Sequence, residues 1–245
     1  MSPRITGATA LRVLAQLRRD PRTVALLLLV PSGLVVLLRY AFDGRPEVFD
    51  RIGGPLLGLF PFITMFIVTS ITMLRERTTG TLERLMTTPL AKLDLLLGYA
   101  VAFALVAAVQ AAAVSAVALG GLGLDVRGSE WLAGALAVGN ATLGMALGLF
   151  VSAFARTEFQ AVQFMPALIF PQFLLCGLFV PRAAMARPLE LASYAMPLTY
   201  AYDAIDRVTR LDTYGATFAL DVAVTLGGAG LALVLGAATL RRRTP

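Results

Sequence analysis

Six long stretches of this chain contain no Asp, Glu, Lys or Arg, and they constrain its fold more than any other feature. They cover residues 23–38, 52–74, 95–124, 131–155, 159–181 and 222–240, with lengths of 16, 23, 30, 25, 23 and 19 residues. A helix needs about 20 apolar residues to cross a bilayer, within a range of about 17–25. The sequence therefore predicts an all-α integral membrane protein of six transmembrane helices. One domain, residues 1–245, holds all the spans, at about 23–39, 52–74, 93–120, 131–155, 159–180 and 217–240.

The basic residues indicate the orientation. Cytoplasmic loops of membrane proteins carry an excess of Lys and Arg. If the N-terminus is cytoplasmic, the inner segments hold 13 of the 21 basic residues, namely Arg4, Arg12, Arg18, Arg19, Arg22, Arg75, Arg77, Arg84, Lys92, Arg156, Arg241, Arg242 and Arg243. We therefore predict a multi-pass protein with both termini in the cytoplasm. Because anionic lipid headgroups attract basic residues beside membrane spans, the net charge of +6 points to membrane lipids and not to a nucleic-acid partner.

A polar segment, residues 75–90, separates the second and third apolar runs. A glycine that is tolerated as an N-cap precedes three apolar residues spaced i, i+3 and i+4, and a proline stops the pattern. These residues are Gly80, Leu82, Leu85, Met86 and Pro89. The spacing is compatible with a short amphipathic helix that docks on a partner, and equally with an ordinary charged loop.

The same segment resembles the Glu-x-x-x-Gly-Thr-Leu-Glu-x-Leu-x-x-Thr-Pro stretch of the type-two ABC exporter permeases. These ABC-2 type transmembrane subunits include daunorubicin-resistance-type and polysaccharide-export permeases. The matching positions are Glu76, Gly80, Thr81, Leu82, Glu83, Leu85, Thr88 and Pro89. The resemblance implies that this segment, with Met86 on its apolar face, is a cytoplasmic coupling helix lying on a separate ATP-binding cassette subunit.

A second resemblance lies before the last span. Residues 196–200, Met-Pro-Leu-Thr-Tyr, are similar to the family's Asn-Pro-Leu-Thr-Tyr signature, with Met196 in place of Asn and Pro197, Leu198, Thr199 and Tyr200 matching. The uncharged stretch 191–202 is too short to cross a bilayer. The resemblance implies external re-entrant helices here, and we expect the charged residues that follow, 203–212, to form a solvated face.

The first 22 residues suit a helix lying in the membrane interface. Leu11, Leu14 and Leu17 recur every third residue among arginines, which is typical of an interfacial amphipathic helix. The family resemblance likewise implies an amphipathic elbow helix at the N-terminus.

Polar side chains within the spans are costly in lipid, so we expect them to face protein or a cavity. Because the family uses the first, second and fifth spans in transport, we predict that polar residues of these spans line the substrate path, namely Thr64, Thr69, Gln163 and Gln172. The alternative is that they only bond neighbouring helices.

A stripe of small residues, Asn140, Gly144, Gly148 and Ser152, recurs every four positions in the fourth span. Such stripes let helices approach closely. Packing within one chain is favoured over a dimer face.

The residue inventory restricts the chemistry. The chain has no histidine and one cysteine, Cys176, so we predict no metal site and no catalytic residue. A P-loop requires Gly-x-x-x-x-Gly-Lys-Ser/Thr, but the only lysine, Lys92, lies between Ala91 and Leu93. We therefore expect no cofactor on this chain, which is not itself an enzyme, and we place ATP and Mg on the partner subunit.

The resemblance and these exclusions together predict a permease subunit of an ATP-driven exporter in the bacterial inner (plasma) membrane. Its substrate would be hydrophobic or amphiphilic, such as a drug (hence antibiotic resistance), a natural product or a lipid-linked glycan, and a second permease copy, identical or paralogous, would complete it. One alternative is an ion-coupled secondary transporter, which usually has ionisable groups at mid-depth. Another is an intramembrane lipid-modifying enzyme, which needs paired acids, a histidine or a metal cluster.

Overall fold

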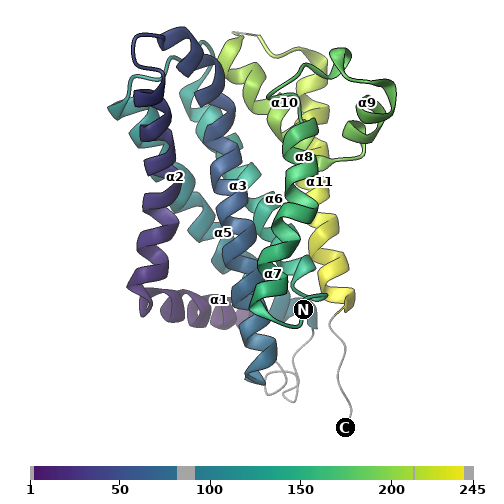
Figure 1. Cartoon of the computed structure of the whole chain (residues 1–245). Coiled ribbons are helices and arrows are strands. Elements are labelled where there is room, and N and C mark those ends of the chain that lie inside the picture. The colour runs from purple at the N-terminus through teal and green to yellow at the C-terminus, as the bar shows by residue number, and fades with distance from the viewer. Residues whose placement is uncertain (1–2, 82–91, 212, 240–245) are drawn as a thin grey trace.

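The computed structural model describes residues 3–81, 92–211 and 213–239, and over these residues the chain is helical without a strand. Figure 1 shows long helices standing side by side, with one helix across one end of the bundle and short helices at the other end. In chain order the elements are α1 (Pro3–Arg18), α2 (Pro21–Ala41), α3 (Pro46–Thr78), α5 (Lys92–Ser115), the π-helix η1 (Ala116–Gly121), α6 (Glu130–Val151), α7 (Glu158–Phe164), the π-helix η2 (Met165–Ile169), α8 (Phe170–Leu175), the 3₁₀-helix η3 (Arg182–Ala184), α9 (Arg187–Tyr194), α10 (Pro197–Arg210) and α11 (Gly215–Thr239).

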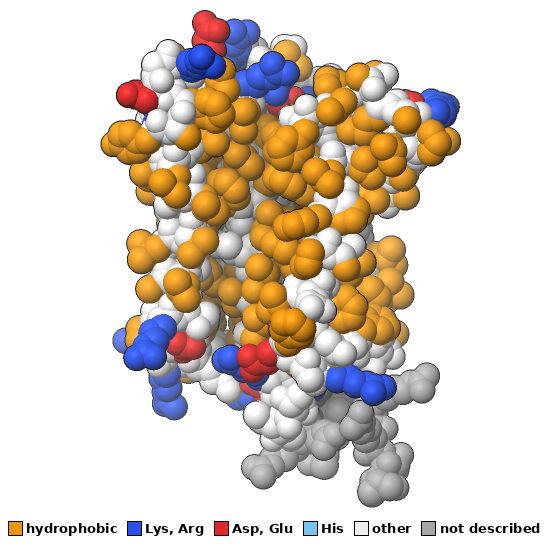
Figure 2. Space-filling model, viewed as in Figure 1, with side chains coloured by type: hydrophobic (Ala, Val, Ile, Leu, Met, Phe, Trp, Pro, Cys, Tyr) orange, Lys and Arg blue, Asp and Glu red, His pale blue; other side chains and the backbone are white. Residues whose placement is uncertain are grey.

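Five helices in the described part of the chain are long and apolar enough to cross a membrane: α2, α3, α5 with η1, α6 and α11. They coincide with the first four predicted spans and the last. On the face drawn in Figure 2, hydrophobic side chains form a band and the charged side chains gather at its two ends. This arrangement is what a bilayer requires, because charged groups are costly in its core.

The fifth predicted span, 159–180, is not a continuous α-helix. α7, η2 and α8 follow one another with 7, 5 and 6 residues and form one column in Figure 1. Pro166 and Pro171 each remove a helical hydrogen bond, and local π adjustments can satisfy the backbone groups that prolines free in membrane helices. With its three glutamines, this column is not among the five long apolar helices. The prediction of six uniform spans is therefore only partly confirmed.

The second span is longer than predicted at both ends. α3 has 33 residues and begins at Pro46, six positions before the predicted start, since proline suits the first turn of a helix. At its other end α3 continues past residue 74 to Thr78. The helix therefore carries the membrane core directly into the polar segment.

Close packing of α3 on α6 forms the centre of the bundle. A Cβ atom added at Gly144 would lie 2.1 Å from the carbonyl oxygen of Phe62, and one added at Gly148 would lie 2.4 Å from that of Phe66. Only glycine permits this approach of two backbones. The small-residue stripe thus packs within the chain, as favoured from the sequence.

The N-terminal helix α1 lies across one end of the bundle (Figure 1). Its buried residues are Thr9, Ala10 and Val13, whereas Leu11 is 68% exposed. Of the three leucines predicted to lie in the membrane interface, Leu11 is thus exposed, whereas Leu14 and Leu17 are half-buried.

The region before the last span contains two short helices. α9 ends at Tyr194 and α10 begins at Pro197, because the residue before a proline is disfavoured in a helix. The charges expected to form a solvated face are mostly paired instead. Asp203 pairs with Arg182, Asp206 with Arg210 at 2.8 Å, and Arg207 with Asp221 at 3.1 Å, while position 212 lies outside the described residues.

Candidate functional site

The candidate site is the last turn of α3, where this helix passes α1 at one end of the bundle (Figure 1). Two consecutive side chains there, Arg75 and Glu76, point to different neighbours because successive helical residues are about 100° apart. Each makes an ion pair with a helix distant in sequence. The end of α3 is therefore held from two sides.

Glu76 joins three helices. Its carboxylate is largely buried, with 9% of the side chain exposed, and lies 3.4 Å from Nη1 of Arg12 on α1. Gln16, one turn further along α1, donates to the same carboxylate at 3.3 Å. Arg12 also donates to the hydroxyl of Tyr99 on α5 and lies over the Tyr99 ring. A movement of the end of α3 therefore acts on α1 directly and on α5 through Arg12.

Arg75 makes a second, bidentate pair on the other side of α3. Its Nε donates to Oε1 of Glu158 at 2.7 Å, and its Nη2 donates to Oε2 at 3.1 Å. Hydrogen bonding to Arg75 lowers the pKa of Glu158 below its usual value, and the same contact raises the pKa of Arg75. Glu158 begins α7, so this pair links α3 to the interrupted column.

α3 ends where the predicted coupling segment begins. Thr79 is its C-cap and donates from its backbone N–H to the carbonyl oxygen of Arg75 at 2.9 Å. Gly80 follows with φ of +72°, the left-handed conformation that glycine adopts after a helix. The Thr81 hydroxyl lies 3.1 Å from that of Thr79. The other predicted coupling residues, Leu82, Glu83, Leu85, Met86 and Pro89, lie outside the described residues.

The four residues predicted to line a path do not share one surface. Thr69 is fully buried in the contact between α3 and α6, where its hydroxyl donates to the Met145 carbonyl of α6 at 3.2 Å. Thr64 accepts a hydrogen bond from Gln110 of α5. Gln163 is exposed on α7, whereas Gln172 on α8 accepts from the backbone N–H of Leu198 at 3.4 Å. Thr64 and Thr69 therefore bond neighbouring helices.

The signature residues 197–200 form the first turn of α10 at the other end of the bundle. Leu198 and Thr199 are fully buried, and the Thr199 hydroxyl donates to the Ser193 carbonyl at 2.8 Å. The Tyr200 hydroxyl donates to the Tyr194 carbonyl at 2.9 Å. The signature therefore fixes the corner between α9 and α10, although Met196 at the N-cap provides no side-chain hydrogen bond.

Sequence reasoning missed the ion pairs around both ends of the bundle. The sequence indicated Arg12 only as a basic residue on the cytoplasmic side, and it gave no role to Tyr99, which lies within an apolar run. The available signal for the first cluster was a lone acidic residue, Glu76, next to a membrane span and opposite an arginine-rich N-terminus. For the second, two acids followed by two arginines within residues 203–210, with Asp206 and Arg210 spaced i and i+4, gave a comparable signal.

Asp203 is expected to make stability depend on pH. Burial raises its pKa to about 6, although nearby Arg182 opposes this shift. The pKa of an Asp carboxyl in the unfolded state is about 3.9. At pH values between about 3.9 and the raised folded-state pKa, the folded state therefore binds more protons than the unfolded state. The contribution of this carboxyl to stability is therefore present below about pH 4 and is lost as the pH rises through about 6, with a total of about 2–3 kcal/mol. Thermal unfolding of the purified protein should show this gain in stability as the pH falls from about 7 to about 5, the window set by the raised pKa of Asp203.

The variant Asp203→Asn should lose this component of the pH profile. Asp43→Asn is the matched control, because the Asp43 side chain is 83% exposed. An unchanged profile for Asp203→Asn would contradict the assignment to this carboxyl.

No group of three or more Asp, Glu, His or Cys side chains that could hold a metal ion occurs within residues 3–81, 92–211 and 213–239. The contacts described at this site are ion pairs and hydrogen bonds that connect α3 to α1 and α7.

Comparison with known proteins identifies the fold family. The family model described as ABC-2 type transporter matches residues 6–208, which include most of α1, the end of α3 and the signature at α10. This chain belongs to the ABC-2 type transporter family. It is accordingly a membrane subunit of an ABC transporter, of a family whose permeases are not themselves ATPases.

Two relatives extend the comparison. ABC transporter G family member 20 of Dictyostelium discoideum is 24% identical over 164 residues, which are 66% of this chain and 22% of that protein. The probable multidrug ABC transporter permease YbhR of Escherichia coli K12 is 29% identical over 148 residues, 60% of this chain and 40% of that protein. The matched parts thus span less than half the length of either relative.

Proposed function

We propose that this ABC-2 type chain is the permease subunit of an ATP-driven exporter, powered by a separate ATP-binding cassette subunit that carries ATP and Mg. The observation that carries the proposal is the attachment of the end of α3. Arg12 and Arg75 pair with Glu76 and Glu158 immediately before the segment that resembles a coupling helix. A force applied to that segment would reach α1, α5 and α7 together. The sequence offers no P-loop with which this chain could bind ATP itself.

The proposed topology has six spans and both termini in the cytoplasm of a bacterial cell. The column from Glu158 to Leu175, fifth in chain order, brings the number of spans to six. Its 18 helical residues are about 27 Å long, and a hydrocarbon core is about 30 Å thick. α1 and the last turns of α11 lie at the same end of the bundle (Figure 1). In this orientation α1 is the interfacial elbow helix, and α9 and α10 are the external re-entrant helices.

The proposed cargo is a hydrophobic or amphiphilic molecule, such as a drug, a natural product or a lipid-linked glycan. The Escherichia coli relative, a probable multidrug permease, favours a drug as cargo, and with it a role in antibiotic resistance. Of the predicted path residues, Gln163 and Gln172 remain the candidates, because they lie on the interrupted column and Gln163 is exposed on it. A second permease copy would supply the opposite wall, and membrane lipids the surroundings.

The test is the apolar face of the proposed coupling helix. Leu85→Asp should release the ATP-binding subunit or uncouple it, because helix-in-groove contacts draw their affinity from apolar anchors. We expect at least a tenfold loss of complex, equivalent to about 1.4 kcal/mol. Complex yield, ATPase rate and export should be measured side by side.

Two further variants define the specificity of this test. Thr87→Asp adds the same charge within the segment but off the predicted apolar face, and it should retain the complex. Glu83→Ala should retain assembly and weaken export, since rim charges mainly set orientation and association rate. If Leu85→Asp leaves all three measurements at wild-type values, the segment is a plain loop and the proposal fails.

A further inference from the structure

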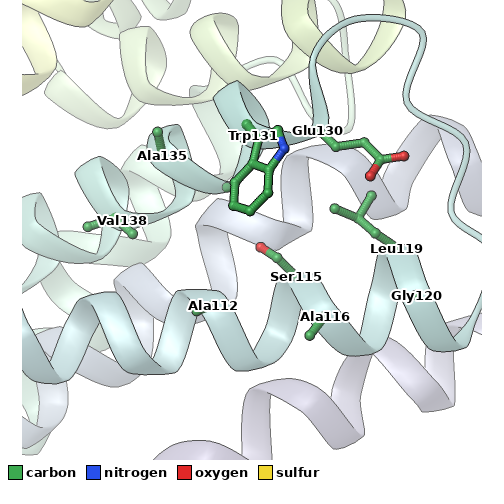
Figure 3. A pocket seen from close by; sticks show the side chains of 10 residues that line it. Ala112, Ser115, Ala116, Leu119, Gly120, Glu130, Trp131, Ala135 and Val138 are labelled. Carbon is green, nitrogen blue, oxygen red and sulfur yellow. The ribbon is translucent and has the colours of Figure 1, made fainter.

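A lateral pocket opens between α5 and α6, near the end of the bundle opposite α1. It has a volume of about 520 Å³, within the range of about 300–1,000 Å³ typical of small-molecule sites. Its walls are small residues of both helices, among them Ala112, Ala116, Gly134 and Ala135, and the π-helix η1 forms part of one wall (Figure 3). The pocket between these apolar walls is large enough for a hydrocarbon chain.

Ser115 provides the first polar group of this pocket. The residue is 8% exposed, and its hydroxyl has no hydrogen-bond partner among the described residues. In Figure 3 this hydroxyl points to the space beneath the Trp131 ring. A buried hydroxyl without a partner is costly, and an acceptor atom of a bound molecule would remove that cost. A lipid ester carbonyl has the required chemistry.

Glu130 provides the second polar group, at the mouth of the pocket. It is the one charged residue in the lining, and no ion pair involves it within the described ranges. Trp131 beside it is 91% exposed and presents an indole face, on which cations bind favourably. A carboxylate and an indole together select a cationic group over an anionic one.

We propose that this pocket binds a membrane phospholipid with a primary-amine headgroup. Its acyl chain lies along the alanine and glycine walls, its ester carbonyl accepts a hydrogen bond from Ser115, and its ammonium group lies between Glu130 and Trp131. The site requires only that the chain spans a membrane. It does not depend on the ATP-binding partner, so the two proposals fail independently.

Trp131 is the only tryptophan of the chain and therefore reports on its own pocket. The purified full chain would be reconstituted with phosphatidylethanolamine or phosphatidylglycerol carrying brominated acyl chains, which quench nearby tryptophan fluorescence. Phosphatidylethanolamine should quench Trp131 at about two- to fivefold lower mole fraction, the preference expected from an exposed charge pair.

Two variants, each with a matched control, test the geometry. Gly134→Leu should abolish the selective quenching, because a Cβ atom there meets only the Ser115 hydroxyl, at 3.9 Å, and the longer side chain fills the pocket. Gly139→Leu is the matched control on α6, since nothing lies within 4 Å of its added Cβ, and it should quench like the wild type. Glu130→Gln should equalise the two lipids, whereas Glu47→Gln, in the exposed first turn of α3, should not.

Equal quenching by the two lipids in the wild type would overturn the proposal, and so would selective quenching that survives Gly134→Leu. Either result would mean that Trp131 meets bulk lipid only.

Discussion

Replacing Gly144 by alanine is expected to lower the stability of the bundle by about 3 kcal/mol or more, at the upper end of overpacking costs. The added Cβ would lie 2.1 Å from the carbonyl oxygen of Phe62 and 2.9 Å from its Cα. These are backbone atoms of α3, so no rotamer change relieves the clash and the two central helices must separate. Thermal unfolding of the purified protein should show a decrease of about 6–12 °C.

Gly139→Ala is the control for this substitution. It lies on the same helix, and nothing is within 4 Å of the added Cβ. Because alanine is a better helix former than glycine, this variant should be neutral or more stable by up to about 1 kcal/mol. If the two variants unfolded at the same temperature, the close contact of α3 with α6 would be refuted.

Reversing the charge of Arg12 or of Glu76 alone is expected to destabilise the protein and to disconnect ATP hydrolysis from export in the assembled complex. Either single change places two like charges at the contact that joins α1, α3 and α5. The double variant Arg12→Glu with Glu76→Arg should recover much of the loss. A glutamate at position 12 accepts from the Tyr99 hydroxyl, and an arginine at position 76 donates to the Gln16 amide oxygen.

The double-mutant cycle should give a coupling free energy of about 0.5–3 kcal/mol from unfolding measurements. Arg18→Glu, an exposed change of the same charge in the last turn of α1, is the control and should have little effect. Additive single effects would remove the basis for treating this cluster as a link. Recovery of stability without recovery of export would leave the pair structural only.

The sequence by itself determined the class of the protein and the positions of most of its spans. Charged groups are costly in lipid, so a long run without charge by itself indicates a membrane span. This rule placed α2, α3, α6 and α11 without any knowledge of their neighbours. The rule was weakest at residues 159–180. This run contains three glutamines and two prolines, and its helix is interrupted by a π-helix that the absence of charge does not predict.

Only the tertiary structure decided which polar residues act together. Thr69 and Gln163 looked equivalent in sequence, yet one is buried against α6 and the other is exposed. Arg12 and Glu76 are 64 positions apart, and the pocket at Trp131 depends on the space left between two separate helices. Periodicity shows that a side chain points to one face of its helix, but the partner on that face comes from packing between distant segments, which no local pattern encodes.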